Sequence, residues 1–180
     1  MKQINMGFTL IEAMLVMAVL TILLAVGVPN YQQFRRDHEL VGAAYALYGD
    51  IQLARTEATK NNSNNIHIYI FNELGSDWCY RITDRDANTC NSCSAPCDIG
   101  GDGLTRGNDQ SNFASTSMIM TTGSISTINI ENRRTGLNPD GDHITFDLDG
   151  RQIEVGLSAI GSARICTPSG TSLSGIESCT

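Results

Sequence analysis

The sequence is short of aromatic residues, of basic residues and, over its first 78 positions, of cysteine. Aromatic residues make up 6% and hydrophobic residues 41% of the 180 positions, which allows one modest core beside an N-terminal anchor but not a large core. Lysine and arginine number 12 against 19 aspartate and glutamate residues, giving a formal net charge of -7. A general nucleic-acid-binding protein normally presents a basic face, so this balance disfavours that class.

Motifs of the common enzyme classes are also absent. The chain has no nucleophile elbow, no Walker loop and no Rossmann glycine pattern. Its histidines, His38, His67 and His143, are scattered without the spacing of metal ligands. The sequence therefore predicts no catalytic residues, no metal site and no cofactor, and it favours a structural role over an enzymatic one.

All six cysteines lie in the C-terminal part of the chain: Cys79, Cys90, Cys93, Cys97, Cys166 and Cys179. An even number confined to one region predicts a disulfide framework in an oxidising compartment, although six cysteines allow 15 pairings. Two alternatives use some of the same residues. The Cys-Asn-Ser-Cys run at 90–93 is compatible with a redox pair, but no βαβ pattern surrounds it. The first four cysteines are compatible with zinc, which export to an oxidising compartment disfavours.

A long apolar run occupies positions 8–28, interrupted by Thr9, Glu12 and Thr21. As a helix these residues span roughly 31 Å, close to the ~30 Å hydrocarbon core of a bilayer. A secretory signal peptide cleaved near 25–27 and a plain transmembrane anchor are two explanations for the run. Neither explains Glu12, because a carboxylate inside a membrane helix costs ~2.5–3.5 kcal/mol and usually has a partner or a function.

The stretch at 6–12, Met-Gly-Phe-Thr-Leu-Ile-Glu, resembles the type III signal of type IV pilins and type II secretion pseudopilins. The resemblance implies that a prepilin peptidase removes residues 1–7 by cutting after Gly7, and that Phe8, the new N-terminus, is N-methylated. It also implies that Glu12 meets the N-terminal amine of a neighbouring subunit during assembly, a pairing that low dielectric strengthens. The implied partners are other pilin subunits, both major and minor, the prepilin peptidase and methyltransferase, and the inner-membrane assembly platform with its separate ATPase.

Positions 29–62 are predicted to continue the helix as its amphipathic half. Pilins often carry a proline where Pro29 stands, and the helix can bend there; a simple helix end is the alternative. Beyond it, apolar residues recur at steps of four and three, which predicts a stripe that packs on a β-domain: Leu40, Ala44, Leu47, Ile51, Ala54 and Ala58. Charged residues fall on the predicted solvent face: Asp37, Glu39, Asp50, Arg55, Glu57 and Lys60. An asparagine-rich run at 61–65 ends the helix.

Residues 63–180 are expected to form a disulfide-containing β-domain, giving an α+β fold with a long N-terminal helix packed on an antiparallel β-sheet domain. Period-two alternation predicts strands at 66–70, 78–82, 118–120, 128–130 and 163–166. The strongest hairpin signal is Asp149-Gly150, between alternating segments at 144–148 and 151–155. Residues 84–112, rich in Asp, Asn, Ser, Gly and Cys, are predicted to form a long surface loop that cysteines hold without a core.

A second resemblance lies in Leu-Ala-Arg-Thr-Glu-Ala at 53–58 and Ile-Thr-Phe-Asp-Leu-Asp-Gly-Arg at 144–151. These segments look like the GspH/FimT/FimU group, the H-type pseudopilins and their pilus counterparts, and the likeness implies a low-abundance subunit near a filament tip. Many pilins also close their C-terminal region with a disulfide. A Cys166–Cys179 bond would do so here, stabilising a tail that cannot fold alone by roughly 3 kcal/mol. The other four cysteines then pair among themselves.

The resulting prediction is a minor pilin of a type IV pilus, a structural subunit that helps to initiate or cap the filament. It would span the inner membrane of a Gram-negative bacterium once, with a periplasmic domain, before it reaches the cell surface in the pilus. An H-type minor pseudopilin of a type II secretion system and a DNA-binding competence pilin are the alternatives.

Two ligands of such proteins are disfavoured by the residues present. The acidic residues near the predicted hairpin lack the complete calcium-loop pattern, which favours turn and surface roles: Asp140, Asp142, Asp147 and Asp149. Gly161-Ser-Ala-Arg164 keeps one arginine of two in the Gly-Arg-x-Arg patch of certain DNA-binding relatives, and Arg133-Arg134 is the only paired basic site besides Arg35-Arg36. Because phosphate binding scales with the number of cationic contacts, direct DNA binding is disfavoured.

Overall fold

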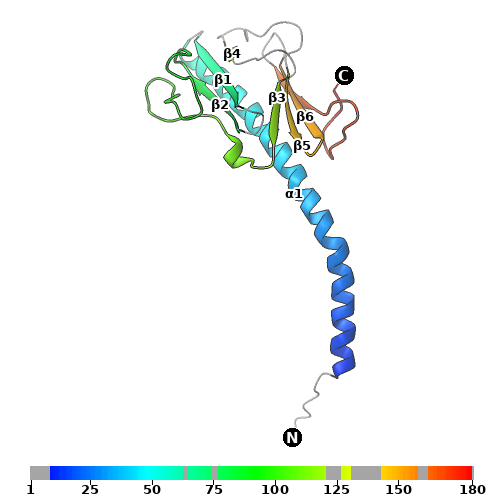
Figure 1. The fold of residues 1–180 in the computed structure, drawn as a ribbon. Coiled ribbons are helices and arrows are strands. Elements are labelled where there is room, and N and C mark those ends of the chain that lie inside the picture. The colour runs from blue at the N-terminus through cyan, green and yellow to red at the C-terminus, as the bar shows by residue number, and fades with distance from the viewer. Residues whose placement is uncertain are drawn as a thin grey trace, which may run out of the picture. The chain divides into compact units, whose positions relative to one another are not determined.

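The computed structural model describes residues 9–62, 65–73, 77–120, 127–130, 143–157 and 162–179. Its elements in chain order are α1 (Leu10–Lys60), β1 (Ile66–Glu73), β2 (Asp77–Thr83), a short 3-10 helix (Gln110–Asn112), β3 (Ser117–Met120), β4 (Thr127–Ile130), β5 (His143–Leu148), β6 (Arg151–Leu157) and β7 (Ala163–Cys166). The fold is α+β, as the sequence predicted, with one long N-terminal helix followed by antiparallel strands (Figure 1). The chain divides into two compact units, Met1–Arg36 and Asp37–Thr180.

The first unit is helical from Leu10 onward. The backbone N–H of Glu12 donates to Oγ1 of Thr9 at 3.3 Å, so the threonine side chain caps the start of the helix. Pro29 lies inside α1, and the helix continues beyond it, which confirms the predicted continuation. The proline has no N–H to donate, so one intrahelical hydrogen bond is missing at this point. The bend expected at Pro29 stays a prediction.

The described apolar side chains of the first unit, from Leu10 onward, are all exposed. An 18-residue window of α1 has a mean hydropathy of 2.5, and 0% of that window is buried. By length and composition, α1 is therefore able to cross a membrane.

The described strands of the second unit form two antiparallel sheets, which agrees with the predicted antiparallel β-sheet domain. One sheet has the order β2-β1-β4 and the other the order β3-β5-β6-β7. The predicted hairpin is confirmed, since β5 and β6 are joined through Leu148 paired with Arg151. Asp149 and Gly150 take φ values of 55° and 80°, the left-handed pair that a two-residue turn of this kind requires.

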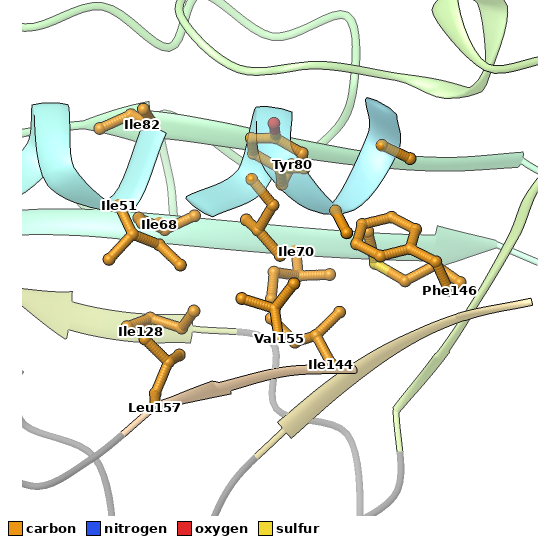
Figure 2. Close-up of a cluster of buried hydrophobic side chains, with 14 of the residues drawn as sticks. Ile51, Ile68, Ile70, Tyr80, Ile82, Ile128, Ile144, Phe146, Val155 and Leu157 are labelled. Carbon is orange, nitrogen blue, oxygen red and sulfur yellow. The ribbon is translucent and has the colours of Figure 1, made fainter. Parts of the chain in front are cut away.

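Both sheets share one hydrophobic core with the C-terminal half of α1. The predicted stripe is confirmed, because each of its residues is at most 1% exposed: Leu40, Ala44, Leu47, Ile51, Ala54 and Ala58. Figure 2 shows Ile51 of α1, Ile68 of β1 and Val155 of β6 among the side chains that meet there. The sole tryptophan, Trp78 of β2, links the sheets because its ring meets Phe146 of β5 edge-on at a centroid distance of 5.3 Å.

Candidate functional site

The predicted cleavage and methylation site, Gly7 and Phe8, lies outside the described residues. Glu12 is exposed in the first turn of α1, three positions after the capping Thr9. Thr-x-x-Glu at a helix start is the capping-box pattern, a signal that is legible in the sequence but was not among the predictions. A carboxylate near a helix N-terminus is also favoured by the helix dipole. Glu12 therefore has a local structural role available besides the assembly role that the resemblance implies.

The outer face of α1 in the second unit is uncharged along its centre. Tyr45, Gly49 and Leu53, each one turn from the next, are exposed there, and we call these three residues the outer strip. A Cβ built on Gly49 would meet nothing within 4 Å, so the strip dips between the two larger side chains. A helix face that only contacts solvent normally carries charged residues. The outer strip is thus suited to contact another apolar surface.

Three acidic residues expected on the solvent face of α1 contact the β-domain instead, which corrects that prediction. Asp37 forms an ion pair with Arg151 of β6. The carboxylate of Glu39 accepts the backbone N–H of Ser115 at 2.8 Å. Periodicity places residues on a helix face, but it does not show how far a partner element wraps around that face. Lys60 is exposed, as predicted.

Asp50 is the third of these residues, and it anchors a polar network between α1, β2 and the following loop. Its Oδ2 accepts from the Tyr80 hydroxyl at 2.8 Å and from Nδ2 of Asn108 at 3.1 Å. Burial raises the pKa of Asp50 above its usual 3.8, while these two hydrogen bonds favour the carboxylate and act in the opposite direction. Burial also raises the pKa of Tyr80, and the Asp50 charge adds to that effect.

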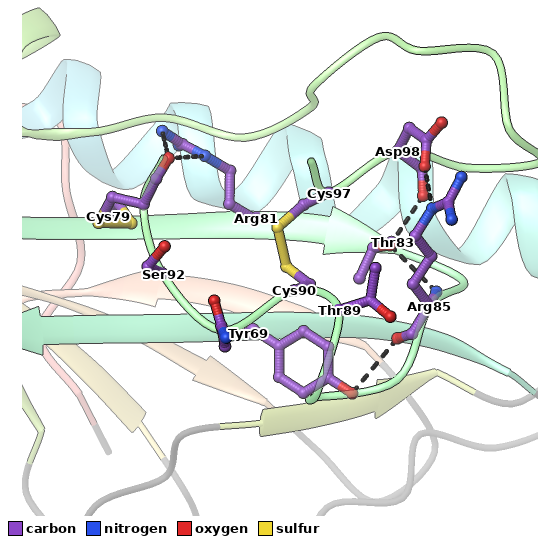
Figure 3. The surroundings of a disulfide bond; sticks show 12 residues. Tyr69, Cys79, Arg81, Thr83, Arg85, Thr89, Cys90, Ser92, Cys97 and Asp98 are labelled. Carbon is purple, nitrogen blue, oxygen red and sulfur yellow. Dashed lines mark hydrogen bonds and ion pairs between the residues drawn. A yellow bond between two sulfur atoms is a disulfide. The ribbon is translucent and has the colours of Figure 1, made fainter. Parts of the chain in front are cut away.

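The cysteine-rich segment at 84–98 lies on the face of the β1–β2 pair that points away from α1. It is held by the disulfides Cys79–Cys93 and Cys90–Cys97, so the predicted pairing of these four residues among themselves is confirmed. The expectation that cysteines hold the loop without a core is wrong in part. Tyr69 of β1 forms a second small buried cluster with Cys90 and Cys97 (Figure 3). Few apolar residues occur in the loop itself, which is why composition gave no sign of this cluster.

Hydrogen bonds from side chains of β1 and β2 add to these contacts. The Thr83 hydroxyl donates to the Asp98 carbonyl at 2.7 Å, and the Tyr69 hydroxyl donates to the Arg85 carbonyl at 3.4 Å (Figure 3). Within the loop, carboxylates pair with guanidinium groups: Asp98 with Arg85 and Asp102 with Arg106. The hydrogen bond from Arg85 is the main reason that the pKa of Asp98 lies below its usual range. The acidic residues of the loop thus order its own backbone.

Arg81 of β2 is the central residue beneath this loop, and it was not among the residues predicted from the sequence. Its guanidinium uses all five of its N–H donors, to the carbonyls of Cys93, Tyr80 and Asn108 and to the carboxylate of Asp109. The arginine is buried, at 7% exposure. The sequence does contain a signal that Arg81 faces the loop. Arg81 alternates with Cys79 and Thr83 on β2, so these three residues share one face of the strand, and the other face is apolar.

An open cavity of about 340 Å³ lies where the cysteine-rich loop approaches the 3-10 helix. Most of the residues that line it are polar: Trp78, Arg81, Cys93, Ser94, Asp109, Gln110 and Ser111. Asp109 caps the 3-10 helix, and hydrogen bonding from Ser111 and Arg81 keeps its pKa below the usual range. The cavity was not predicted from the sequence, because it forms between segments that are about fifteen residues apart.

The predicted Cys166–Cys179 disulfide is confirmed at the C-terminus. It closes a loop whose end runs beside Thr167, since Thr167 donates to Glu177 and Cys179 donates to Thr167, each at 2.8 Å between backbone atoms. The Sγ atom of Cys179 lies 3.3 Å from Oε2 of Glu154 on β6.

The structure describes some of the remaining candidate residues and not others. Asp147 accepts the backbone N–H of Gly150 at 3.3 Å, which confirms a turn role for that carboxylate. Asp140 and Asp142 lie outside the described residues, as do Arg133, Arg134 and Gly161. Arg164 is exposed on β7.

Comparison of the chain with protein-family models, with curated proteins and with solved structures found no match in any of the three.

Proposed function

We propose that this chain is a minor pilin of a type IV pilus, a structural subunit that helps to initiate or cap the filament. One observation carries the proposal. The segment at 10–28 is apolar apart from Glu12 and Thr21, it is exposed along its whole length, and it belongs to a helix whose residues 40–58 line the core of a disulfide-bonded domain. An exposed apolar surface of this size requires a bilayer or other helices to cover it.

The outer strip supports packing against neighbouring subunits beyond the membrane-spanning length. Tyr45 and Leu53 are 52% and 37% exposed, and Gly49 between them allows another helix to approach closely. In this proposal α1 packs against the helices of other pilin subunits along its exposed face. Glu12 pairs with the N-terminal amine of a neighbour, and Phe8 supplies the methylated N-terminus after a prepilin peptidase has cut at Gly7.

The three disulfides support export to an oxidising compartment, because such bonds are rare in cytosolic proteins. The proposed course begins with a single-pass protein in the inner membrane with a periplasmic domain. The inner-membrane assembly platform then transfers it into the pilus at the cell surface.

A clean deletion of the gene tests this function. Surface pili, secreted exoenzymes and natural transformation should be scored together in the deletion strain and in the complemented strain. We expect loss of pili with normal secretion. Loss of secretion with normal pili would favour an H-type minor pseudopilin of a type II secretion system. Loss of transformation with pili intact would favour a DNA-binding competence pilin.

A further inference from the structure

The three disulfides differ in how deeply their cysteine residues are buried. Cys90 and Cys97 are both buried beneath the loop that they close. Cys79 and Cys166 are buried as well, whereas their partners Cys93 and Cys179 are half-buried. Thiol–disulfide exchange requires that an external thiolate reaches one sulfur from outside. Two of the three disulfides therefore present a residue that a thiolate can attack.

The charges beside these two residues separate them further. The Cys179 sulfur lies 3.3 Å from a carboxylate oxygen of Glu154, which repels an approaching thiolate. The Cys93 carbonyl accepts hydrogen bonds from the Arg81 guanidinium at 3.0 and 3.2 Å. A neighbouring cation attracts a thiolate and stabilises the thiolate that leaves. Asp109, 3.2 Å from Arg81, offsets part of that positive charge.

The surroundings of Cys93 also provide space. Cys93 lines the open cavity of about 340 Å³, together with Ser94, Gln110 and Ser111 on its rim. Trp78, the sole tryptophan of the chain, is also among the residues that line the cavity. A dithiol, either free or at the active site of an oxidoreductase, can thus approach Cys93 without unfolding the core.

We propose that Cys79–Cys93 is an exchangeable disulfide, opened and closed by a dithiol that attacks Sγ of Cys93 from the cavity. One thiolate of the dithiol forms a mixed disulfide with Cys93, and Cys79 leaves as a thiolate that takes up a proton. The second thiolate of the dithiol attacks the mixed disulfide and releases Cys93, which takes up a proton in turn. The dithiol is oxidised to a disulfide, and the chain gains two thiols.

The contacts that survive this reaction make it reversible. Cys90–Cys97 still closes the loop, and Tyr69 still packs beneath it. Arg81 still holds the Cys93 carbonyl, so the two thiols stay near one another for reclosure. Arg81 is in this sense a positioning residue for the disulfide. Opening removes the covalent link between the loop and β2, and it leaves the shared core of α1 and the sheets intact.

Graded reduction of the full chain in mild detergent tests the proposal. The protein is exposed to increasing dithiothreitol without denaturant, trapped with iodoacetamide at timed intervals, and mapped by peptide mass spectrometry. We expect Cys79 and Cys93 to be alkylated together and at least ~10-fold faster than the other four cysteines. Trp78 fluorescence should change with the same time course. Prior labelling of Cys166 and Cys179, or simultaneous labelling of all six cysteines, would overturn the proposal.

Two matched variants test the reasons for the selectivity. Glu154→Gln should accelerate reduction of Cys166–Cys179 and leave that of Cys79–Cys93 unchanged, because it removes the repelling carboxylate. Ser94→Glu, compared with Ser94→Gln, should slow reduction of Cys79–Cys93 alone, because it places a negative charge on the cavity rim. Equal rates for Ser94→Glu and Ser94→Gln would show that Cys93 is not attacked from the cavity and would overturn the assignment.

Discussion

Gly107 determines how closely the end of the long loop approaches β2. The backbone N–H groups of Tyr80 and Ile82 donate to the carbonyls of Asn108 and Arg106 at 2.9 and 3.0 Å, so this segment covers the edge of the sheet. Gly107 lies between these contacts with a φ of +120°, and a Cβ at this position would be 2.1 Å from the Tyr80 carbonyl oxygen. Only glycine fits, because both the conformation and the contact exclude a side chain.

Gly107→Ala should therefore destabilise the protein by more than ~2 kcal/mol, since it combines a strained backbone with a backbone clash. Gly103→Ala is the matched control, because Gly103 has a φ of +72° and a Cβ added there would meet nothing within 4 Å. That change should cost about 1 kcal/mol. Urea unfolding in detergent measures the loss of stability in both variants. Equal costs would show that the Gly107 contact with Tyr80 is dispensable.

Asp50 should give the protein an unusual dependence on pH. Its pKa is raised above 3.8 in the folded chain, so the folded state binds this proton more tightly than the unfolded state. The stabilisation that results is complete below 3.8 and is lost as the pH rises through the folded pKa. The difference in free energy of unfolding between wild type and Asp50→Asn should fall across that window and then stay constant.

Asp109→Asn provides the comparison of opposite sign, because the pKa of Asp109 is lowered in the folded chain, chiefly by hydrogen bonding from Ser111. Its carboxylate should contribute stability above 3.8 that is lost as the pH falls through the folded pKa. Urea titrations at several pH values separate the two variants. A wild-type advantage over Asp50→Asn that grows with pH would mean that Tyr80 and Asn108 outweigh the burial of Asp50.

At the scale of elements, the C-terminal half of α1 has one face buried in the core and one face exposed. Leu47 is 0% exposed in the core, whereas Leu53 lies on the outer strip. Leu47→Ala should cost ~3 kcal/mol of stability through the cavity it leaves. Leu53→Ala should cost less than ~1 kcal/mol but reduce incorporation into the filament, because it removes only surface that a neighbouring subunit would cover.

Urea unfolding and immunoblotting of sheared filament fractions distinguish these effects, since the same substitution is made on two faces of one helix. Ser94→Ala, at an exposed position of the cysteine-rich loop away from α1, is a control that should change neither quantity. Normal incorporation of Leu53→Ala would remove the outer strip from the proposed subunit contacts.

The elements themselves follow from local patterns in the sequence. The step-four and step-three spacing from Leu40 to Ala58 predicted the buried stripe, and Asp149-Gly150 predicted the hairpin of β5 and β6. The division into two sheets was not predictable in this way, because β1 pairs with β4 as well as with β2, and the pairing of strands distant in the chain leaves no local period.

For the candidate site too, features set by tertiary packing were harder to predict than features set by local sequence. The resemblance to pilins implied the Cys166–Cys179 bond, whereas the two bonds among Cys79, Cys90, Cys93 and Cys97 could not be assigned from the sequence, because four cysteines pair in more than one way. Three features depend on how separate loops pack against the sheet: the cavity, the Arg81 contacts and the network around Asp50. Residues that interact only through tertiary folding carry no periodic signal, and Arg81 was visible at most as a charge on the cysteine-bearing face of its strand.

At the scale of the whole molecule, the two units differ in how their apolar side chains are covered. In the described part of residues 37–180, the large apolar side chains are mostly buried in the shared core, and three disulfides add covalent links. The segment at 10–28 has no such cover within the described chain and depends on its surroundings. A protein built in this way is suited to exchange one apolar environment for another, as the proposed transfer from membrane to filament requires.

Glu12 is the residue on which that transfer should depend, and two roles for it make different predictions. If its charge pairs with a neighbour's N-terminus, Glu12→Val and Glu12→Gln should both block incorporation while cleavage after Gly7 proceeds normally. If it acts through the capping box, Glu12→Gln should assemble normally, because glutamine also completes that box. Thr9→Ala removes the cap observed at 3.3 Å and keeps the charge, so we expect it to assemble. Filament fractions and the mass of the processed N-terminus measure both steps, and failure of Thr9→Ala together with normal assembly of Glu12→Gln would assign Glu12 to helix capping alone.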